Sequence, residues 1–190
     1  TAYRRQRQMC IRDRSEDGKI SIVRDADGKN IVIINDIRFR GKRKMSWKEV
    51  EEFLKEYVKT YYEIEAYSEK IYIGTDFPGE YAHSKDTKAL AGANAKAKAN
   101  AAQAIGELIR TAVNKSESED YGGRHGNRAQ NGWYRYDVRF GLPVYNQEGK
   151  LERYNIFSAR MLVRCDADGK LYLYDIVRTK KETSTPSGLF

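Results

Sequence analysis

The chain has 190 residues, of which 40% are hydrophobic and 33% are charged, and its formal net charge is +8. This length and composition suit one domain with a hydrophobic core, and no run of about 20 apolar residues is present that would cross a membrane. Two cysteines and two histidines exclude a disulfide framework and a histidine-rich metal site. We therefore expect a cytoplasmic α+β protein that uses no cofactor and no metal.

Residues 1–14 resemble a sequencing scar rather than a natural segment. The codons of Met9–Arg14 can be written as the end sequence of a transposon that is used to fragment DNA for sequencing, and Tyr3–Gln6 differs by one residue from another frame of that DNA. Without this segment, which holds five arginines and one aspartate, the net charge is +4. The alternative is a basic N-terminal arm that binds nucleic acid. We expect one α+β domain over 15–186 and a tail, 187–190, that ends a larger protein or continues into it.

An N-terminal β-hairpin is predicted ahead of the first helix. Two runs rich in β-branched residues, 19–24 and 30–35, flank a turn that contains Asp27-Gly28. An Asp-Gly step supplies the positive φ that a tight hairpin needs. A helix is then predicted over 46–62, because Ser-Trp-Lys-Glu at its start fits a capping box and apolar residues follow at helical spacing.

The middle of the chain predicts a short strand, a long helical region and a loop. Residues 70–74 are rich in β-forming side chains. The alanine-rich stretch 84–114 strongly favours helix, and Ala91–Asn94 marks the point where we expect it to divide into two helices. Residues 115–131 are polar and contain glycines, so we expect a mobile loop there.

Three strands joined by four-residue turns are predicted to close the fold, at 133–145, 151–165 and 170–179. Because strand side chains alternate between faces, one face of this meander becomes apolar and packs against the two main helices. That face is predicted to hold Tyr134, Tyr136, Val138, Phe140, Leu142, Phe157, Ala159, Met161, Val163, Tyr172, Tyr174 and Ile176.

The opposite face of the meander is polar and carries the candidate binding site. With four-residue turns, Arg135, Arg160 and Asp175 fall in one row across the three strands, and Arg139 lies on the same face. Two facing arginines repel unless a carboxylate or an anion lies between them. Asp175 is the internal candidate for that role, and a phosphate is the external one. The alternative is an ordinary solvated face with ladders of salt bridges.

Further candidate site residues lie outside this sheet. His125 lies in the predicted loop, and the unperturbed histidine pKa of about 6.5 suits acid–base chemistry. The alternative is a loop histidine without a chemical role. Lys96 in the alanine-rich region and Lys181 and Thr183 near the C-terminus are candidate phosphate-binding residues, and Ser184 is a candidate catalytic residue.

Several short strings occur in an order that is more specific than any one of them. They are Asp36-Ile37, Gly41-Lys42, Trp47, Ile71–Gly74, Asp76–Pro78, Glu80-Tyr81, Ser84–Lys88, Ala95–Ala101, Gly132–Asp137, Leu142–Tyr145 and Lys181–Pro186. In this order they resemble the large polyvalent protein-associated domains, most of all the third type, over roughly 30–186. The resemblance implies an accessory α+β module in a very long phage or conjugative-element protein. It also implies a partner that is either nucleic acid, with RNA favoured over DNA, or a neighbouring domain of the same polyprotein.

The order of helices followed by an antiparallel meander is also similar to small ribonucleases of the barnase, EndoU, colicin and RelE kind. This similarity implies attack of the RNA 2′-hydroxyl on the phosphate without a metal, with His125 as the general acid or base. The phosphate would be held by Arg135, Arg139 and Arg160, and the site would be closed by Lys181, Thr183 or Ser184.

Overall fold

The computed structural model of the chain describes residues 18–41, 43–118 and 129–183. The strands are β1 (Ile20–Arg24), β2 (Asn30–Ile34), β3 (Tyr61–Ile64), β4 (Glu69–Tyr72), β5 (Val113–Ser118), β6 (Trp133–Tyr145), β7 (Leu151–Cys165) and β8 (Leu171–Lys181). The helices are α2 (Trp47–Leu54), α3 (Phe77–His83), α4 (Lys85–Ala89), α5 (Gly92–Ala101) and α6 (Ile105–Thr111), with 3-10 turns at Lys55–Tyr57 and Ala102–Ala104. The predicted α+β fold, with an N-terminal hairpin and a C-terminal meander, is confirmed.

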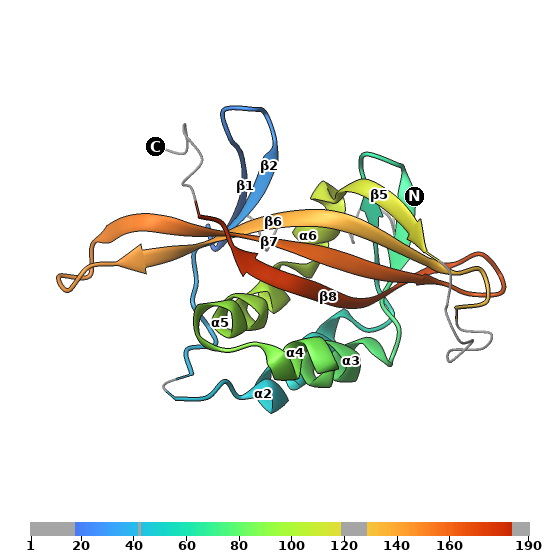
Figure 1. Ribbon diagram of the computed structural model, residues 1–190, viewed down its shortest axis with the longest axis horizontal. Coiled ribbons are helices and arrows are strands. Elements are labelled where there is room, and N and C mark those ends of the chain that lie inside the picture. Colours follow the sequence, from blue (N-terminus) through green and yellow to red (C-terminus); the bar gives the residue numbers. More distant parts are fainter. Residues whose placement is uncertain (1–17, 42, 119–128, 184–190) are drawn as a thin grey trace.

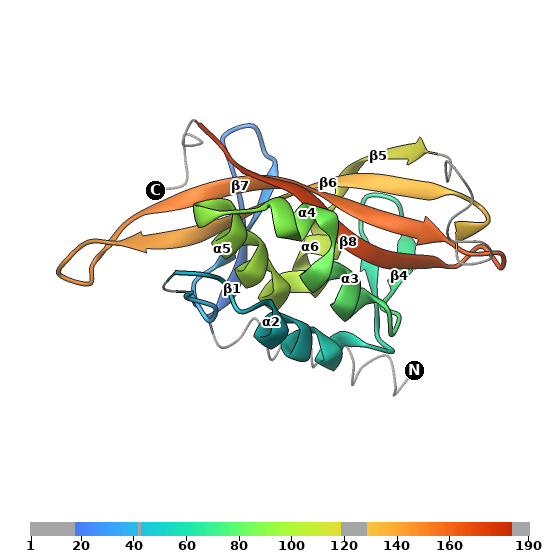
Figure 2. The same cartoon turned by 60° about the horizontal axis from the view of Figure 1, so that its bottom comes forward.

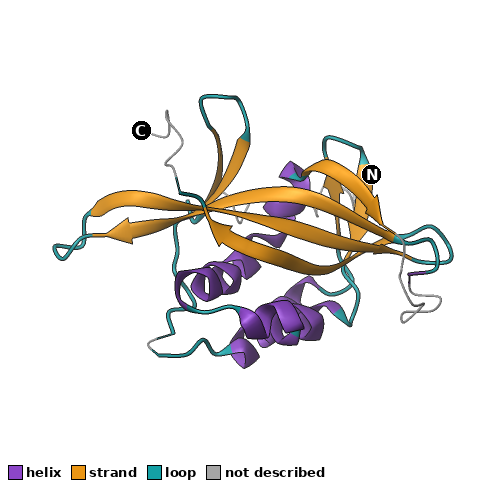
Figure 3. Ribbon diagram, in the orientation of Figure 1, coloured by secondary structure: helices purple, strands orange, loops and turns teal. Residues whose placement is uncertain are grey.

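The fold has two layers, a curled sheet and a group of helices. The strand order is β1-β2-β6-β7-β8-β4-β3, and β5 pairs with β6 beside this path. The helices lie together on one side of the sheet, and the β1–β2 hairpin projects away from them (Figure 1, Figure 2). The β6–β7 ribbon extends beyond the other strands at one end (Figure 3). Within the described ranges, no helix has the length and apolar character that crossing a membrane requires.

The first helix is shorter than the predicted range 46–62. α2 passes into a 3-10 turn and ends there, and Lys59 then takes a positive φ of 68°. The residues that follow form β3, which pairs antiparallel with β4. The β-branched and aromatic side chains within Val58–Tyr62 disfavour helix, and pairing with β4 satisfies the backbone of β3. Ser46 makes no side-chain cap hydrogen bond, so the predicted capping box is also wrong.

The alanine-rich region divides close to the predicted point. Leu90 and Ala91 are extended and separate α4 from α5. The predicted loop 115–131 is partly wrong, because 115–118 belong to β5 and pair antiparallel with β6. This pairing covers an edge of β6 that would otherwise expose its backbone groups. Residues 119–128 of the predicted loop lie outside the described residues.

The predicted faces of β6 and β7 are confirmed, although the register between them differs from the prediction by two residues. Arg135 lies opposite Leu162, and Asp137 lies opposite Arg160. The turn and an irregularity beside it account for this shift. A shift by an even number of residues leaves every side chain on its own face, so the apolar face packs into the core as predicted.

The pairing of β7 with β8 contradicts part of the predicted apolar face. Two irregularities shift the register along this pair, and Val163 lies opposite Leu173. Leu173 is fully buried, whereas Tyr172 and Tyr174 are only partly buried. An extra residue in one strand reverses the face that the next side chains occupy, and no sequence signal marked it.

The predicted row of charged residues across the three strands is wrong because the registers of both strand pairs, β6–β7 and β7–β8, differ from the prediction. Arg135 and Asp175 both lie opposite Leu162, and Arg160 lies opposite Val177. The two arginines therefore do not face each other. Their mutual repulsion, which motivated an anion between them, is removed by the register.

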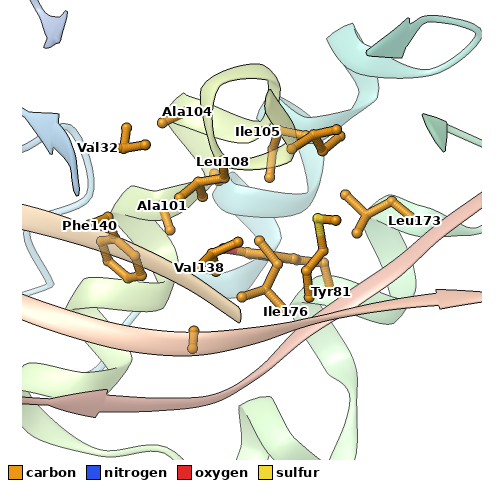
Figure 4. Close-up of a cluster of buried hydrophobic side chains, with 14 of the residues drawn as sticks. Val32, Tyr81, Ala101, Ala104, Ile105, Leu108, Val138, Phe140, Leu173 and Ile176 are labelled. Atoms are coloured by element: carbon orange, nitrogen blue, oxygen red, sulfur yellow. The ribbon is translucent and has the colours of Figure 1, made fainter. Parts of the chain in front are cut away.

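The core lies between the helices and the sheet. Figure 4 shows Leu108 and Ile105 of α6 close to Val138 of β6 and Ile176 of β8, and all four side chains are buried. The buried side of α5 holds four alanines together with the polar side chains of Lys98 and Asn100. The polar face of β6 and β7 is thereby left on the side away from the helices.

Candidate nucleic-acid interface

A groove of about 810 Å³ lies along the polar face of β6, β7 and β8 and is bounded by the β1–β2 turn and the end of α6. Arg139, Ser158 and Arg160 line it because polar residues alternate with core residues along β6 and β7. Arg178 and Lys180 of β8 extend the cationic lining. The lining is mixed in charge, and its acids are Asp25, Asp27, Asp137 and Glu182.

Arg139 is held between two carboxylates inside this groove. Its Nε and Nη2 donate to the two carboxylate oxygens of Glu182 at 2.8 and 3.0 Å, and its Nη1 donates to Asp25 Oδ2 at 2.7 Å. The hydrogen bond from Arg139 is the main reason why the pKa of Asp25 is lowered. An anion would have to displace one of these carboxylates. Arg139 therefore fastens the β1–β2 turn and the end of β8 to β6, a role that the sequence did not suggest.

Arg160 is more open to solvent. Its Nε lies 3.6 Å from Asp137 Oδ1, and the two side chains are 42% and 46% exposed. Asp137 Oδ2 also accepts a hydrogen bond of 3.0 Å from Asn114 Nδ2. A solvent-exposed ion pair of this kind contributes little free energy, so Arg160 can exchange Asp137 for a phosphate at small cost.

Three exposed groove cations were not among the predicted ligands, namely Lys29 of the β1–β2 turn and Arg178 and Lys180 of β8. The Arg178 and Lys180 side chains are exposed, and within the described part of the chain neither forms an ion pair. Arg178 has a positive φ of 56°, and its backbone N–H donates to Asp86 Oδ1 of α4 at 3.0 Å. The sequence does show cations near the end of the third predicted strand, and these were the available signal for a cationic groove lining. Which of these cations reaches the groove depends on the register irregularities between β7 and β8, and the irregularities are not visible in the sequence.

The remaining predicted phosphate ligands do not line the groove. Arg135 is half-buried on β6, beside Ser116 of β5. Lys96 is exposed on α5, in the helix layer. Lys181 and Thr183 are exposed at the end of β8, where the Lys181 N–H donates to Asn94 Oδ1 at 3.2 Å. The fold thus brings together Arg139 and Arg160 among the predicted ligands and leaves these four apart from them.

Neither predicted catalytic side chain outside the sheet can be placed. His125 and Ser184 lie outside the described residues. The other histidine, His83, ends α3, and its Nε2 lies 2.7 Å from Glu51 Oε2. Within the described lining, the groove therefore offers carboxylates but no imidazole for acid–base chemistry.

A buried charge cluster lies on the helix side of β8. The fully buried Lys98 of α5 extends its Nζ to Asp175 Oδ1 at 2.8 Å and to Asp86 Oδ2 at 3.1 Å. Burial raises the pKa of Asp175 to about 6, and the adjacent ammonium opposes that shift. Asp86 also accepts the N–H of Arg178, so the cluster fixes the backbone beneath the exposed groove cations. Asp175 is thus the partner of Lys98 rather than of the predicted arginine row.

Comparison with known proteins adds no family or fold assignment. No family model, no curated protein and no solved structure matches this chain. Among residues 18–41, 43–118 and 129–183, no group of histidine, cysteine or acidic side chains could hold a metal ion. The polar groups of the described groove lining are cations, carboxylates, amides and hydroxyls.

Proposed function

We propose that this chain is an accessory module that binds nucleic acid, and that the groove on its polar sheet face holds the sugar–phosphate backbone. One observation carries this proposal. Arg178 and Lys180 are exposed cations that line the same groove as Arg160, and neither side chain forms an ion pair within the described part of the chain. Arginine and lysine side chains are the usual phosphate contacts of nucleic-acid-binding proteins.

The composition of the lining favours phosphate contacts over base contacts. No aromatic side chain is present among the described lining residues, so no platform for base stacking is available there. Ser158 and Asn114 add uncharged hydrogen-bonding groups beside the cations. We therefore expect weak sequence preference and a steep dependence on salt concentration.

The resemblance to large polyvalent protein-associated domains stays a prediction. In that setting the module would hold RNA, in preference to DNA, close to the catalytic domains of a longer phage or mobile-element protein. The ribonuclease alternative depends on His125, and cleavage in the binding experiment is the result that would support it.

The experiment measures the binding of fluorescent single-stranded RNA and DNA to the full chain by anisotropy, in a chelator and over a range of KCl concentrations. The Arg178→Gln/Lys180→Gln variant removes two phosphate contacts, and we expect the slope of log Kd against log salt to fall by about 1.4. Lys85→Gln/Lys150→Gln makes the same charge change at exposed positions outside the groove and serves as the control.

Two results would contradict the proposal. If the groove variant binds with the same affinity and the same salt slope as the control, the groove does not contact phosphate. If RNA is cut and His125→Ala abolishes cutting, the module is a nuclease and not only a binding domain, because general acid–base groups contribute about 10²–10⁴-fold.

A further inference from the structure

A second basic surface lies in the segment that follows β2 and runs into the first residues of α2. Residues 38–48, here called the basic segment, contain no acidic residue, and their cations are Arg38, Arg40, Lys42, Arg43, Lys44 and Lys48. Lys42 lies outside the described residues, and the other five side chains are exposed. None of these five forms an ion pair with the described part of the chain. The groove, by contrast, mixes acids with its cations.

The basic segment is fixed to the helix layer by buried polar side chains. Asn100 Oδ1 accepts the N–H of Phe39 at 3.0 Å, and Asn100 Nδ2 donates to the Phe39 carbonyl at 2.9 Å. Gln103 Nε2 donates to the carbonyl of Asp36 at 2.8 Å. The buried Phe39 ring also packs edge-on against Phe53, with centroids 5.8 Å apart. The start of the segment is thus held in one conformation, which reduces the entropy lost on binding.

The asparagine that holds Phe39 is itself held within α5. Asn100 Nδ2 also donates to the carbonyl of Lys96, whose exposed side chain lies one helical turn earlier on α5. The surface ends at an acidic border, where Arg38 and Lys48 share a hollow with Glu49, Glu52 and Glu56.

The basic segment and the groove lie in different parts of the molecule. The segment runs from β2 to α2 (Figure 1, Figure 2), whereas the groove is lined by the β1–β2 turn, the end of α6 and strands β6, β7 and β8. No residue of the basic segment lines the groove. One strand of nucleic acid bound in the groove therefore leaves the basic segment accessible.

Nucleic acid fits the basic segment better than an anionic membrane does. Binding at a membrane surface is strengthened by apolar side chains that point outward between the charges. Met45 and Trp47 are instead partly buried and pack against the core, and Phe39 is buried within it. The outward-facing side chains are the cations, which match a repeating phosphate backbone.

We propose that the basic segment is a second nucleic-acid-binding surface, and that one molecule holds two strands at once through the segment and the groove. The bridging of two strands rests on the proposed function of the groove, whereas binding by the segment does not. Such a module would gather or tether strands rather than read their sequence.

The experiment is a capture assay with the full chain. An RNA strand is fixed to beads, the protein is added, and retention of a fluorescent strand that cannot pair with the first is measured. We expect capture by the wild type. Arg40→Gln/Arg43→Gln/Lys44→Gln should weaken binding by the segment about a hundredfold near 0.1 M salt, because three phosphate contacts are lost. The segment variant should still bind one strand through the groove, and Arg178→Gln/Lys180→Gln should still bind one strand through the segment. Neither variant should retain the fluorescent strand on the beads.

The control and the opposing results separate the two surfaces. Lys85→Gln/Lys88→Gln/Lys150→Gln has the same charge change at exposed positions and should capture like the wild type. Full capture by the segment variant would overturn the inference, and so would loss of all RNA binding in the groove variant. Loss of all binding in the segment variant alone would overturn the groove assignment and leave the segment as the RNA surface. If the segment variant Arg40→Gln/Arg43→Gln/Lys44→Gln loses binding to phosphatidylserine vesicles while its RNA binding is unchanged, the nucleic-acid assignment of the segment is overturned.

Discussion

Two charge clusters each join one cation to two carboxylates, and the two cations differ in their exposure to solvent. Lys98 lies between Asp86 and Asp175, and Arg139 lies between Asp25 and Glu182. The Lys98 side chain is 0% exposed, whereas the Arg139 side chain is 20% exposed and faces the groove. One cation and two carboxylates therefore form a buried structural cluster around Lys98 and a solvent-accessible clamp around Arg139.

The two clusters respond to pH in opposite directions, because a different cause dominates at each carboxyl. In the buried cluster, desolvation raises the pKa of Asp175 to about 6 even though Lys98 opposes it. In the clamp, the hydrogen bond from Arg139 is the largest cause and lowers the pKa of Asp25. A carboxyl with a raised pKa contributes more stability in acid, and one with a lowered pKa contributes more at neutral pH.

Removing the buried cation should have the largest effect. Lys98→Met leaves Asp86 and Asp175 without their shared ammonium, and breaking a buried ion pair in this way costs about 3–5 kcal/mol of unfolding free energy. Urea unfolding at pH 7 measures it. Lys98→Met/Asp175→Leu should recover much of the loss, because it removes the unpaired buried charge. A loss below about 1 kcal/mol in Lys98→Met would mean that the ammonium does not hold this cluster together.

The second prediction concerns the pH dependence of the buried cluster. The folded pKa of Asp175, about 6, lies above the value of a free aspartate. Its contribution to stability is therefore complete below about pH 4 and is lost as the pH rises through about 6, a change of about 3 kcal/mol. Asp175→Asn removes this titration. The difference in unfolding free energy between the variant and the wild type, measured by urea at several pH values, should change over that window. A constant difference would contradict the raised pKa.

The clamp should contribute less, and its effect should be local. Arg139→Gln loses charge-assisted hydrogen bonds to two carboxylates, and partial exposure limits the expected cost to about 1–2 kcal/mol. The β1–β2 turn loses its side-chain link to β6 while β2 stays paired with β6, so the amide hydrogens of the hairpin should exchange faster than those of β7. Arg139→Lys keeps the charge but loses the bidentate geometry. Its unfolding free energy and its hairpin exchange rates should lie between those of the wild type and of Arg139→Gln. Unchanged exchange in the hairpin would show that Arg139 does not fasten it.

The smallest effect on stability is expected for Arg160. Its pairing with Asp137 is long and exposed, so Arg160→Gln should change the unfolding free energy by less than about 0.5 kcal/mol. The same variant should weaken RNA binding and reduce the salt slope by about 0.7. Thermal unfolding and anisotropy on one preparation test both parts. A large loss of stability would place Arg160 with the structural cations rather than with the groove surface.

Local sequence was enough to predict the turns, most of the strands and one face of the meander. Gly28 and Gly169 adopt positive φ values of 76° and 79° in the two Asp-Ala-Asp-Gly turns. In each turn the first aspartate, Asp25 or Asp166, accepts backbone N–H groups two and four residues later. These interactions are complete within five residues, so they do not depend on the rest of the fold. The alternation of polar and apolar side chains along β6 and β7 is likewise set by neighbouring residues in the sequence.

Long-range packing set the partners of the charged residues, and the sequence contained no signal for them. Arg139 and Asp25 are 114 positions apart, and Lys98 and Asp175 are 77 positions apart. Which of these residues meet depends on the register irregularities of β7 and β8 and on the end of the first helix at β3. Alternative strand registers differ little in free energy, and only the packing of the assembled sheet and helices selects one of them. The predicted arginine row failed for this reason, and the groove contains Arg178 and Lys180 for the same reason.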